Sequence, residues 1–156
     1  MSALDSLYQE LILDHSKRPH GRGELESETG HTASHHELNP SCGDEITFDV
    51  AYDAQSGTIT EVKWRGQGCS ISQSSASILT ELLEEKPLTI AEAQERIDAF
   101  REMLQSRGEG EPNEQLLGDA VAFQGVAKFV MRVKCAMLSW VALEADLRQL
   151  EAQLSE

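Results

Sequence analysis

The chain has 156 residues, of which 40% are hydrophobic and 5% aromatic. It is long enough to bury one sizeable core, built mainly from aliphatic side chains. Its 27 acidic and 13 basic residues give a net charge of −14, which argues against nucleic acid or an anionic membrane as partner because both are bound through basic surfaces. The first residues lack the pattern of a signal peptide, and no apolar run approaches the ~18 residues of a membrane span. We therefore expect one cytoplasmic domain over residues 1–156.

The front half of the sequence predicts a helix, a loop and a hairpin. Apolar residues at helical spacing predict an amphipathic helix over residues 3–15. The polar segment 16–40 predicts a long loop, with room for a short strand near its end. Alternating apolar residues over 46–52 predict a half-buried strand, and residues 58–66 predict its partner after a turn.

The back half predicts helices only. Helical spacing begins near Ser72 and continues through Leu83, and Thr89 with Glu92 forms a capping-box signal that opens a helix ending near Leu104. After a loop over residues 105–113, two more helical stretches are predicted, about 114–128 and 131–153. Strands in front and helices behind favour an α+β fold.

The three cysteines and one aspartate form the main candidate site. An odd number of cysteines without a secretory signal favours metal binding or thiol chemistry over a disulfide framework. Cys42 and Asp44, in "NPSCGD", lie at the start of the first predicted strand, where residues two apart point the same way. Cys69 follows the second strand, and the hairpin brings it beside the first pair. Cys135 completes the set if the last helix docks end-on.

The donor types indicate the chemistry. Three thiolates and a carboxylate are all normal zinc ligands, and iron–sulfur clusters also take thiolates. The spacing matches no standard zinc motif, so three ordinary buried cysteines remain an alternative. Cys69 lies near a helix N-terminus, whose dipole stabilises a thiolate. Arg132 lies three positions before Cys135, where its cation would favour a thiolate, although a solvated arginine is the simpler interpretation.

Other residues give weaker signals. His31, His35 and His36 cluster in "HTASHHE" but lack a metal-site spacing, and we interpret them as exposed loop side chains. His15 and His20 flank a basic bend and carry no clear signal. A cysteine hydrolase with Cys69 as nucleophile is a remote alternative, because "GQGCS" is half of a nucleophile elbow and the closing glycine is missing. A structural zinc protein acting as a docking adaptor is a further alternative.

Four motifs together resemble the U-type iron–sulfur cluster assembly proteins, in the SufU branch of the family that includes IscU and the N-terminal part of NifU. They are "LYQELILDHSKRPHGRG", "NPSCGDEITFDV", "GQGCSISQSSASILTELL" and "GVAKFVMRVKCAMLSWVAL", and they cover nearly the whole chain. The resemblance implies a small antiparallel β-sheet packed against several α-helices. It also implies metal ligands at Cys42, Asp44, Cys69 and Cys135, with Arg132 at the position of the SufU arginine.

Two features of the resemblance favour the SufU branch. Lys134 stands where IscU-type scaffolds carry a histidine, and the helical segment between Cys69 and Cys135 is long, as in SufU proteins. Val130 departs from the family's usual proline, which leaves open how sharply the chain breaks before the last helix.

The resemblance implies a zinc-bound sulfurtransferase of the SUF system. A SufS-like, pyridoxal-phosphate cysteine desulfurase would supply persulfide sulfur, Cys42 would accept it, and downstream SUF assembly proteins would use it. The residues themselves favour no single cysteine as acceptor. The alternative is a scaffold that assembles and transfers a [2Fe–2S] cluster, or binds iron, on the same ligands. Whether the chain is an enzyme therefore stays open.

Overall fold

The computed structural model describes residues 3–26 and 30–155. In chain order the elements are α1 (Ala3–Lys17), β1 (His31–Asn39), β2 (Asp44–Asp53), β3 (Thr58–Gln67), α2 (Ser70–Glu84), α3 (Ile90–Gln105), α4 (Glu114–Leu117), the 3₁₀ helix η1 (Gly118–Lys128) and α5 (Val130–Leu154). A small sheet packed against helices confirms the predicted α+β class.

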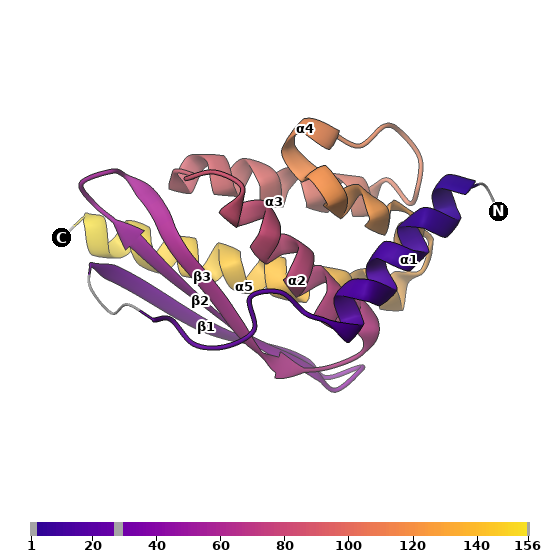
Figure 1. Ribbon diagram of the computed structural model, residues 1–156, viewed down its shortest axis with the longest axis horizontal. Coiled ribbons are helices and arrows are strands. Elements are labelled where there is room, and N and C mark those ends of the chain that lie inside the picture. The colour runs from indigo at the N-terminus through magenta and orange to yellow at the C-terminus, as the bar shows by residue number, and fades with distance from the viewer. Residues whose placement is uncertain (1–2, 27–29, 156) are drawn as a thin grey trace.

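The sheet is antiparallel, with strand order β1-β2-β3. Ile46, Phe48 and Val50 alternate along β2 and are buried, which is why this strand is readable from sequence. Figure 1 shows the sheet on one side of the molecule, with α5 running along it and α1, α3 and α4 beyond. The predicted hairpin is confirmed: Glu45 at the start of β2 lies opposite Gln67 at the end of β3.

The segment His31–Asn39 corrects the sequence analysis. It was expected to be loop with at most a short strand, but it forms the full edge strand β1, paired with β2 from His31 opposite Tyr52 to Asn39 opposite Asp44. Of its residues only Ala33 and Asn39 are buried. An edge strand needs little apolar surface, so its sequence shows no clear hydrophobic alternation.

The predicted helix over 114–128 is also corrected. Only Glu114–Leu117 is α-helical, and Gly118–Lys128 continues as a 3₁₀ helix. Gly118 has φ 50° and ψ −128°, a backbone conformation outside the right-handed helical region that glycine adopts readily. This residue therefore ends the α-helix.

The core aligns the two helices that carry Cys69 and Cys135. The ring of Trp140 stacks on Phe100 with centroids 3.9 Å apart. The indole N–H of Trp140 donates to Ser75 Oγ at 2.9 Å, and the Ser75 hydroxyl donates to the carbonyl oxygen of Ala136 at 2.6 Å. Ser75 thus links the middle of α2 to the residue after Cys135, which fixes the position of α5 along α2.

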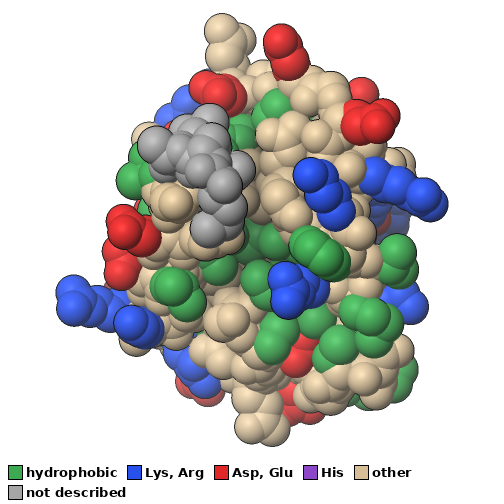
Figure 2. Space-filling model, turned by 90° about the vertical axis from the view of Figure 1, so that its right-hand side faces the viewer, with side chains coloured by type: hydrophobic (Ala, Val, Ile, Leu, Met, Phe, Trp, Pro, Cys, Tyr) green, Lys and Arg blue, Asp and Glu red, His purple; other side chains and the backbone are tan. Residues whose placement is uncertain are grey.

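The surface is mixed rather than uniformly acidic. Figure 2 shows the side of the molecule toward which α1 projects, where hydrophobic side chains lie among lysine and arginine side chains. Phe129, Val130 and Met131, at the start of α5, have exposed fractions of 51%, 67% and 51%. Within the described ranges, no helix combines the length and apolar character needed to cross a bilayer.

Candidate metal centre

Cys42 lies on the turn that joins β1 to β2. The backbone N–H groups of Cys42 and Gly43 both donate to the carbonyl of Asn39, at 3.2 and 2.9 Å, and the N–H of Ser41 donates to Asn39 Oδ1. Gly43 has φ 71°, a left-handed conformation that favours glycine. The turn leaves Cys42 exposed.

Asp44, the first residue of β2, is 2% exposed and faces the start of α2. Its Oδ1 accepts the backbone N–H of Cys69 at 3.0 Å, and its Oδ2 lies 3.6 Å from Cys69 Sγ. A Cβ on Gly68 would lie 2.7 Å from Asp44 Oδ1. The close approach of these two segments of the chain therefore requires glycine at position 68. The pairing of β2 with β3 therefore places Asp44 next to Cys69.

Cys69 is the N-cap residue of α2, with φ −73° and ψ 171°. The predicted position at a helix N-terminus is confirmed, and the helix begins at Ser70, two residues earlier than expected. The Cys69 thiol has Asp44 and Ser72 Oγ as hydrogen-bond partners. No histidine of residues 3–26 or 30–155 is among them, so the cysteine hydrolase alternative gains no support.

Cys135 lies in the second turn of α5 and is 4% exposed. Its sulfur is 3.5 Å from Cys42 Sγ and 4.0 Å from Nδ2 of the buried Asn39. Burial raises the pKa of the Cys135 thiol well above its usual range, and the other groups of the cluster raise it further. A coordinated cation has the opposite effect, because it deprotonates a thiol outright.

The structure thus brings all four predicted residues together. The ligand atoms of Cys42, Asp44 and Cys135 all lie within 4.8 Å of one another, and Cys69 joins them through Asp44. Two thiolates about 2.3 Å from a tetrahedral zinc ion are roughly 3.8 Å apart, close to the 3.5 Å between Cys42 and Cys135. The donor set fits zinc, and its use as a ligand set stays a prediction.

Arg132 lies in the first turn of α5 and is exposed. Its guanidinium carbon is 4.8 Å from the centre of the Phe129 ring. Within the described ranges Arg132 has no hydrogen bond or ion pair to the four candidate ligands. The predicted stabilisation of a thiolate by Arg132 is therefore not supported by a direct contact. Phe129 itself is extended, with φ −118° and ψ 102°, and caps α5. The chain therefore breaks before Val130 without the family's proline.

The three histidines expected on a loop lie on β1 instead, only His36 is exposed, and their side chains do not converge. His31 Nδ1 lies 3.1 Å from Gln153 Oε1, His35 pairs with Glu37 at 2.8 Å, and His36 is exposed and lies 3.6 Å from Glu45. The sequence analysis missed Asn39 as a support of the site. Its signal was the Asn-Pro pair before Cys42, which is typical of a turn.

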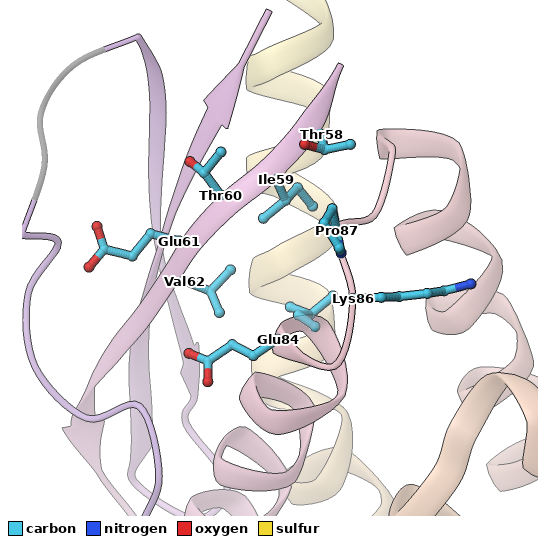
Figure 3. Close-up of a pocket in the computed structure, with 9 residues that line it drawn as sticks. Thr58, Ile59, Thr60, Glu61, Val62, Glu84, Lys86 and Pro87 are labelled. Atoms are coloured by element: carbon cyan, nitrogen blue, oxygen red, sulfur yellow. The ribbon is translucent and has the colours of Figure 1, made fainter. Parts of the chain in front are cut away.

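A separate pocket of about 300 Å³ lies between β3 and the end of α2. Figure 3 shows Glu61 and Glu84 extending from these two elements, with Lys86 pointing away toward the helices. The residues that line the pocket and are labelled in Figure 3 are Thr58, Ile59, Thr60, Glu61, Val62, Glu84, Lys86 and Pro87. The lining contains no thiol, and the pocket is therefore separate from the cysteine cluster.

Comparison with known proteins agrees with this fold. The family described as NifU-like N terminal domain matches residues 7–136. The chain therefore belongs to the U-type family of iron–sulfur cluster assembly proteins.

Two relatives align with almost the full chain. The chain is 39% identical to the iron–sulfur cluster assembly scaffold protein IscU of Streptococcus pyogenes serotype M1, over 98% of this chain and 91% of the relative. It is 37% identical to the zinc-dependent sulfurtransferase SufU of Bacillus subtilis, over 95% of this chain and 94% of the relative.

Solved structures show the same fold. A candidate iron–sulfur cluster assembly scaffold protein for the SUF system from Fervidobacterium islandicum superposes with a TM-score of 0.77 at 34% identity, covering 91% of this chain and 97% of that chain. The N-terminal part of a NifU-like protein from Brucella abortus gives a TM-score of 0.79 at 23% identity, covering 97% and 99%. At that identity the second match shows the fold alone.

Proposed function

We propose that this chain is a zinc-binding sulfur acceptor in iron–sulfur cluster assembly, and that Cys42 takes sulfur from the persulfide of a pyridoxal-phosphate cysteine desulfurase of the SUF system. The observation that carries the proposal is the unequal placement of the four donors. Cys42 is exposed on a turn, and Asp44 and Cys135 are buried. Cys69 is also exposed, but its backbone N–H is held by Asp44. The zinc-dependent Bacillus relative, at 37% identity, supports the same assignment.

Cys42, Asp44, Cys69 and Cys135 would hold the zinc, which when bound keeps its cysteine ligands deprotonated. The buried Asn39 amide stays against Cys135, and the turn presents Cys42 to solvent. Cys42 and Cys69 are both exposed, but Cys69 is tied to Asp44 by its backbone N–H, so the Cys42 turn is the freer of the two to meet a partner.

The transfer step is a thiol exchange. The Cys42 thiolate attacks the outer sulfur of the partner's persulfide, and a bond forms between Cys42 Sγ and that sulfur. The sulfur–sulfur bond of the partner breaks, and its electron pair stays on the partner's cysteine as a thiolate. One thiolate replaces another, so the step needs no external oxidant or reductant. Cys42 then carries the persulfide that downstream SUF assembly proteins would use.

The surroundings of Cys135 supply a surface for the partner. Phe129, Val130 and Met131 are exposed apolar side chains, and Arg132 lies over the Phe129 ring. Apolar and arginine side chains are enriched at the centres of protein interfaces. We assign Arg132 to docking, because its ring contact places it on this surface.

The second candidate function is a scaffold that builds a [2Fe–2S] cluster as its cargo on the same four residues. The 39% identical Streptococcus relative carries that name. Lys134 is exposed, and its ammonium has no lone pair to offer a metal. The ligand set is therefore the same in both functions, and only the cargo distinguishes them.

Metal and acid-labile sulfide content, measured on protein purified without oxygen, separates the two functions. The proposal predicts about one zinc per chain without sulfide, and loss of zinc in Cys42→Ala, Asp44→Ala, Cys69→Ala and Cys135→Ala. Ser41→Ala, beside Cys42 on the same turn, is the matched control and should keep its zinc. Iron with matching sulfide would replace the proposal with the scaffold function. Folded variants without metal loss would remove the site.

The acceptor is tested by a single exposure to persulfide-loaded desulfurase, followed by alkylation and mass analysis of each cysteine. We expect one added sulfur on Cys42 and none after Cys42→Ser. An added sulfur on Cys69 in both proteins would reassign the acceptor. A docking adaptor with no sulfur chemistry would gain sulfur on no cysteine.

A further inference from the structure

A second group of metal-binding side chains lies outside the cysteine cluster. We propose that His15, Glu81 and Asp119 form a divalent metal site of nitrogen and oxygen donors. One ligand atom from each of the three residues lies within 4.8 Å of the other two. This proposal goes beyond the sulfur-acceptor function and does not depend on it.

The three residues come from three elements that pack together. His15 is in α1, Glu81 in α2 and Asp119 in η1. Glu81 is twelve positions after Cys69 in α2, and a helix rises about 1.5 Å per residue, or roughly 18 Å over this length. The group is therefore separate from the thiols, and its donors are separated by 66 and 38 positions in sequence, from His15 to Glu81 and from Glu81 to Asp119.

The His15 ring is held in the orientation that a ligand needs. The residue is 9% exposed, and its Nδ1 lies 2.7 Å from Ser77 Oγ. Ser77 Oγ also accepts the backbone N–H of His20 at 2.7 Å. A hydroxyl oxygen has two acceptor lone pairs, so Ser77 can also take the Nδ1 proton. Nε2 then presents its lone pair to Glu81, 3.8 Å away. Metal-binding histidines are commonly oriented by such a hydrogen bond at the other ring nitrogen.

The spacing needs only small side-chain movements. Nitrogen and oxygen ligands about 2.1 Å from a tetrahedral ion are roughly 3.4 Å apart, against the 3.8 Å between His15 and Glu81. Asp119 is exposed and Glu81 is half-buried, so both carboxylates can close on an ion while the buried imidazole stays in place.

The donor set indicates the class of ion. One imidazole and two carboxylates suit Mn²⁺, Fe²⁺ or Zn²⁺, whereas thiolates select softer ions. Three protein donors leave coordination positions for water. The site would tie α1 to α2 and η1, because its donors come from all three.

A second His–Glu pair, His20 with Glu84, lies in the same region. His20 Nε2 lies 2.6 Å from Glu84 Oε2, one helical turn after Glu81. This pair is not part of either candidate metal group found among the described residues. A histidine and a glutamate can pair through a shared proton without any metal ion. Glu84 pairs with His20 but has no third ligand beside it in the part of the chain that the structure describes, so it is the matched control for Glu81.

Mn²⁺ is the probe, because it prefers the harder donors to thiolates. Protein given no more than one equivalent of zinc, which the thiolates take first, is titrated with Mn²⁺, and free Mn²⁺ is followed by electron paramagnetic resonance. We expect one bound Mn²⁺ per chain, weakened by at least about tenfold in Glu81→Gln and Asp119→Asn, and unchanged in Glu84→Gln. Bound Mn²⁺ should also broaden the ring proton resonances of His15 before those of His35.

Two results would overturn the proposal. One is no saturable Mn²⁺ binding, in which case His15 and Glu81 form only a proton-dependent ion pair. The other is binding that Glu84→Gln weakens as much as Glu81→Gln and Asp119→Asn do, which marks general attraction to an acidic surface. Circular dichroism of each variant checks its fold. Since Asp119 is exposed, Asp119→Asn tests the site without removing a buried group.

Discussion

Asp44 and Asp146 are both buried aspartates, with exposed fractions of 2% and 0%, but their surroundings differ. Asp44 lies where β2 begins, and it accepts a backbone N–H and contacts the thiol of Cys69. Asp146 lies in the middle of α5, and neither of its carboxyl oxygens has a hydrogen-bond partner among the described residues.

The difference separates two consequences of burial. Burial raises the pKa of Asp146 to about 9, and the negative charge of Asp49 adds to this effect. Asp146 is therefore protonated at neutral pH. Asp44 instead accepts the backbone N–H of Cys69, and the sulfurs of Cys42, Cys69 and Cys135 lie close to its carboxylate. Burial alone does not mark a ligand, and the neighbouring groups decide whether a buried carboxyl has a role.

Asp44→Ala should give the largest effect. It removes one of the four proposed ligands and the acceptor of the Cys69 N–H. We therefore expect zinc to bind more than about 100-fold more weakly, a larger loss than that of an outer hydrogen-bonding partner. A chelator competition measures the affinity. Asp53→Ala, at the other end of β2, is the control, and equal zinc loss in both variants would contradict the assignment of Asp44.

Ser75→Ala tests a buried hydroxyl that accepts one hydrogen bond, from Trp140, and donates another, to Ala136. It leaves the Trp140 N–H without its acceptor, and should lower the free energy of unfolding by roughly 2 kcal/mol. Urea denaturation of the zinc-bound protein measures this change. Because Ser75 also bonds to Ala136, we expect weaker zinc retention as well, and unchanged zinc retention would show that Cys135 is positioned without this link.

Asp146→Asn should raise stability relative to the parent increasingly as pH rises toward about 9. The folded-state pKa of Asp146 is raised, so its contribution is fully present below its ordinary pKa of 3.8 and is lost as pH rises through about 9. An asparagine does not titrate, so the difference between variant and parent should grow with pH over this window. Denaturation at a series of pH values measures it, with the exposed Asp98→Asn as control. A constant difference would mean that Asp146 has a partner.

Val130→Pro should give the smallest effect, a gain of about 0.5 kcal/mol. Val130 is the first residue of α5, where proline is favoured because its backbone N–H is not needed in the helix. The preceding Phe129 is already extended, as a residue before proline must be. Thermal unfolding measures the change, and a lower midpoint would show that the N–H of Val130 has a partner.

Sequence patterns predicted the parts of the fold that depend on local chemistry. The alternation around Phe48 identified β2, and Thr89 with Glu92 identified the capping box that opens α3, whose two hydrogen bonds are both present. The meeting of Asp44 and Cys69 followed from hairpin geometry. The strand β1 was missed because an edge strand rich in histidine lacks the apolar alternation that identifies a buried one.

Other features depend on tertiary contacts that spacing does not encode. The unusual backbone of Gly118 ends α4 after Leu117. His15 gave no signal because its partners are far away in sequence. The lack of hydrogen-bond partners for Asp146 among the described residues could not be predicted either, because the sequence around it has the ordinary spacing of a helix.

The turn that carries Cys42 has a consequence for how activity and stability relate. Its two backbone bonds both end on the carbonyl of Asn39, and the paired residues of β1 and β2 begin beyond it. Local opening of so small a unit requires far less free energy than global unfolding. Under the proposed function, the Cys42 turn can open toward a partner while the sheet stays intact. Substitutions at Pro40 can therefore change how readily this turn opens without a matching loss of thermal stability.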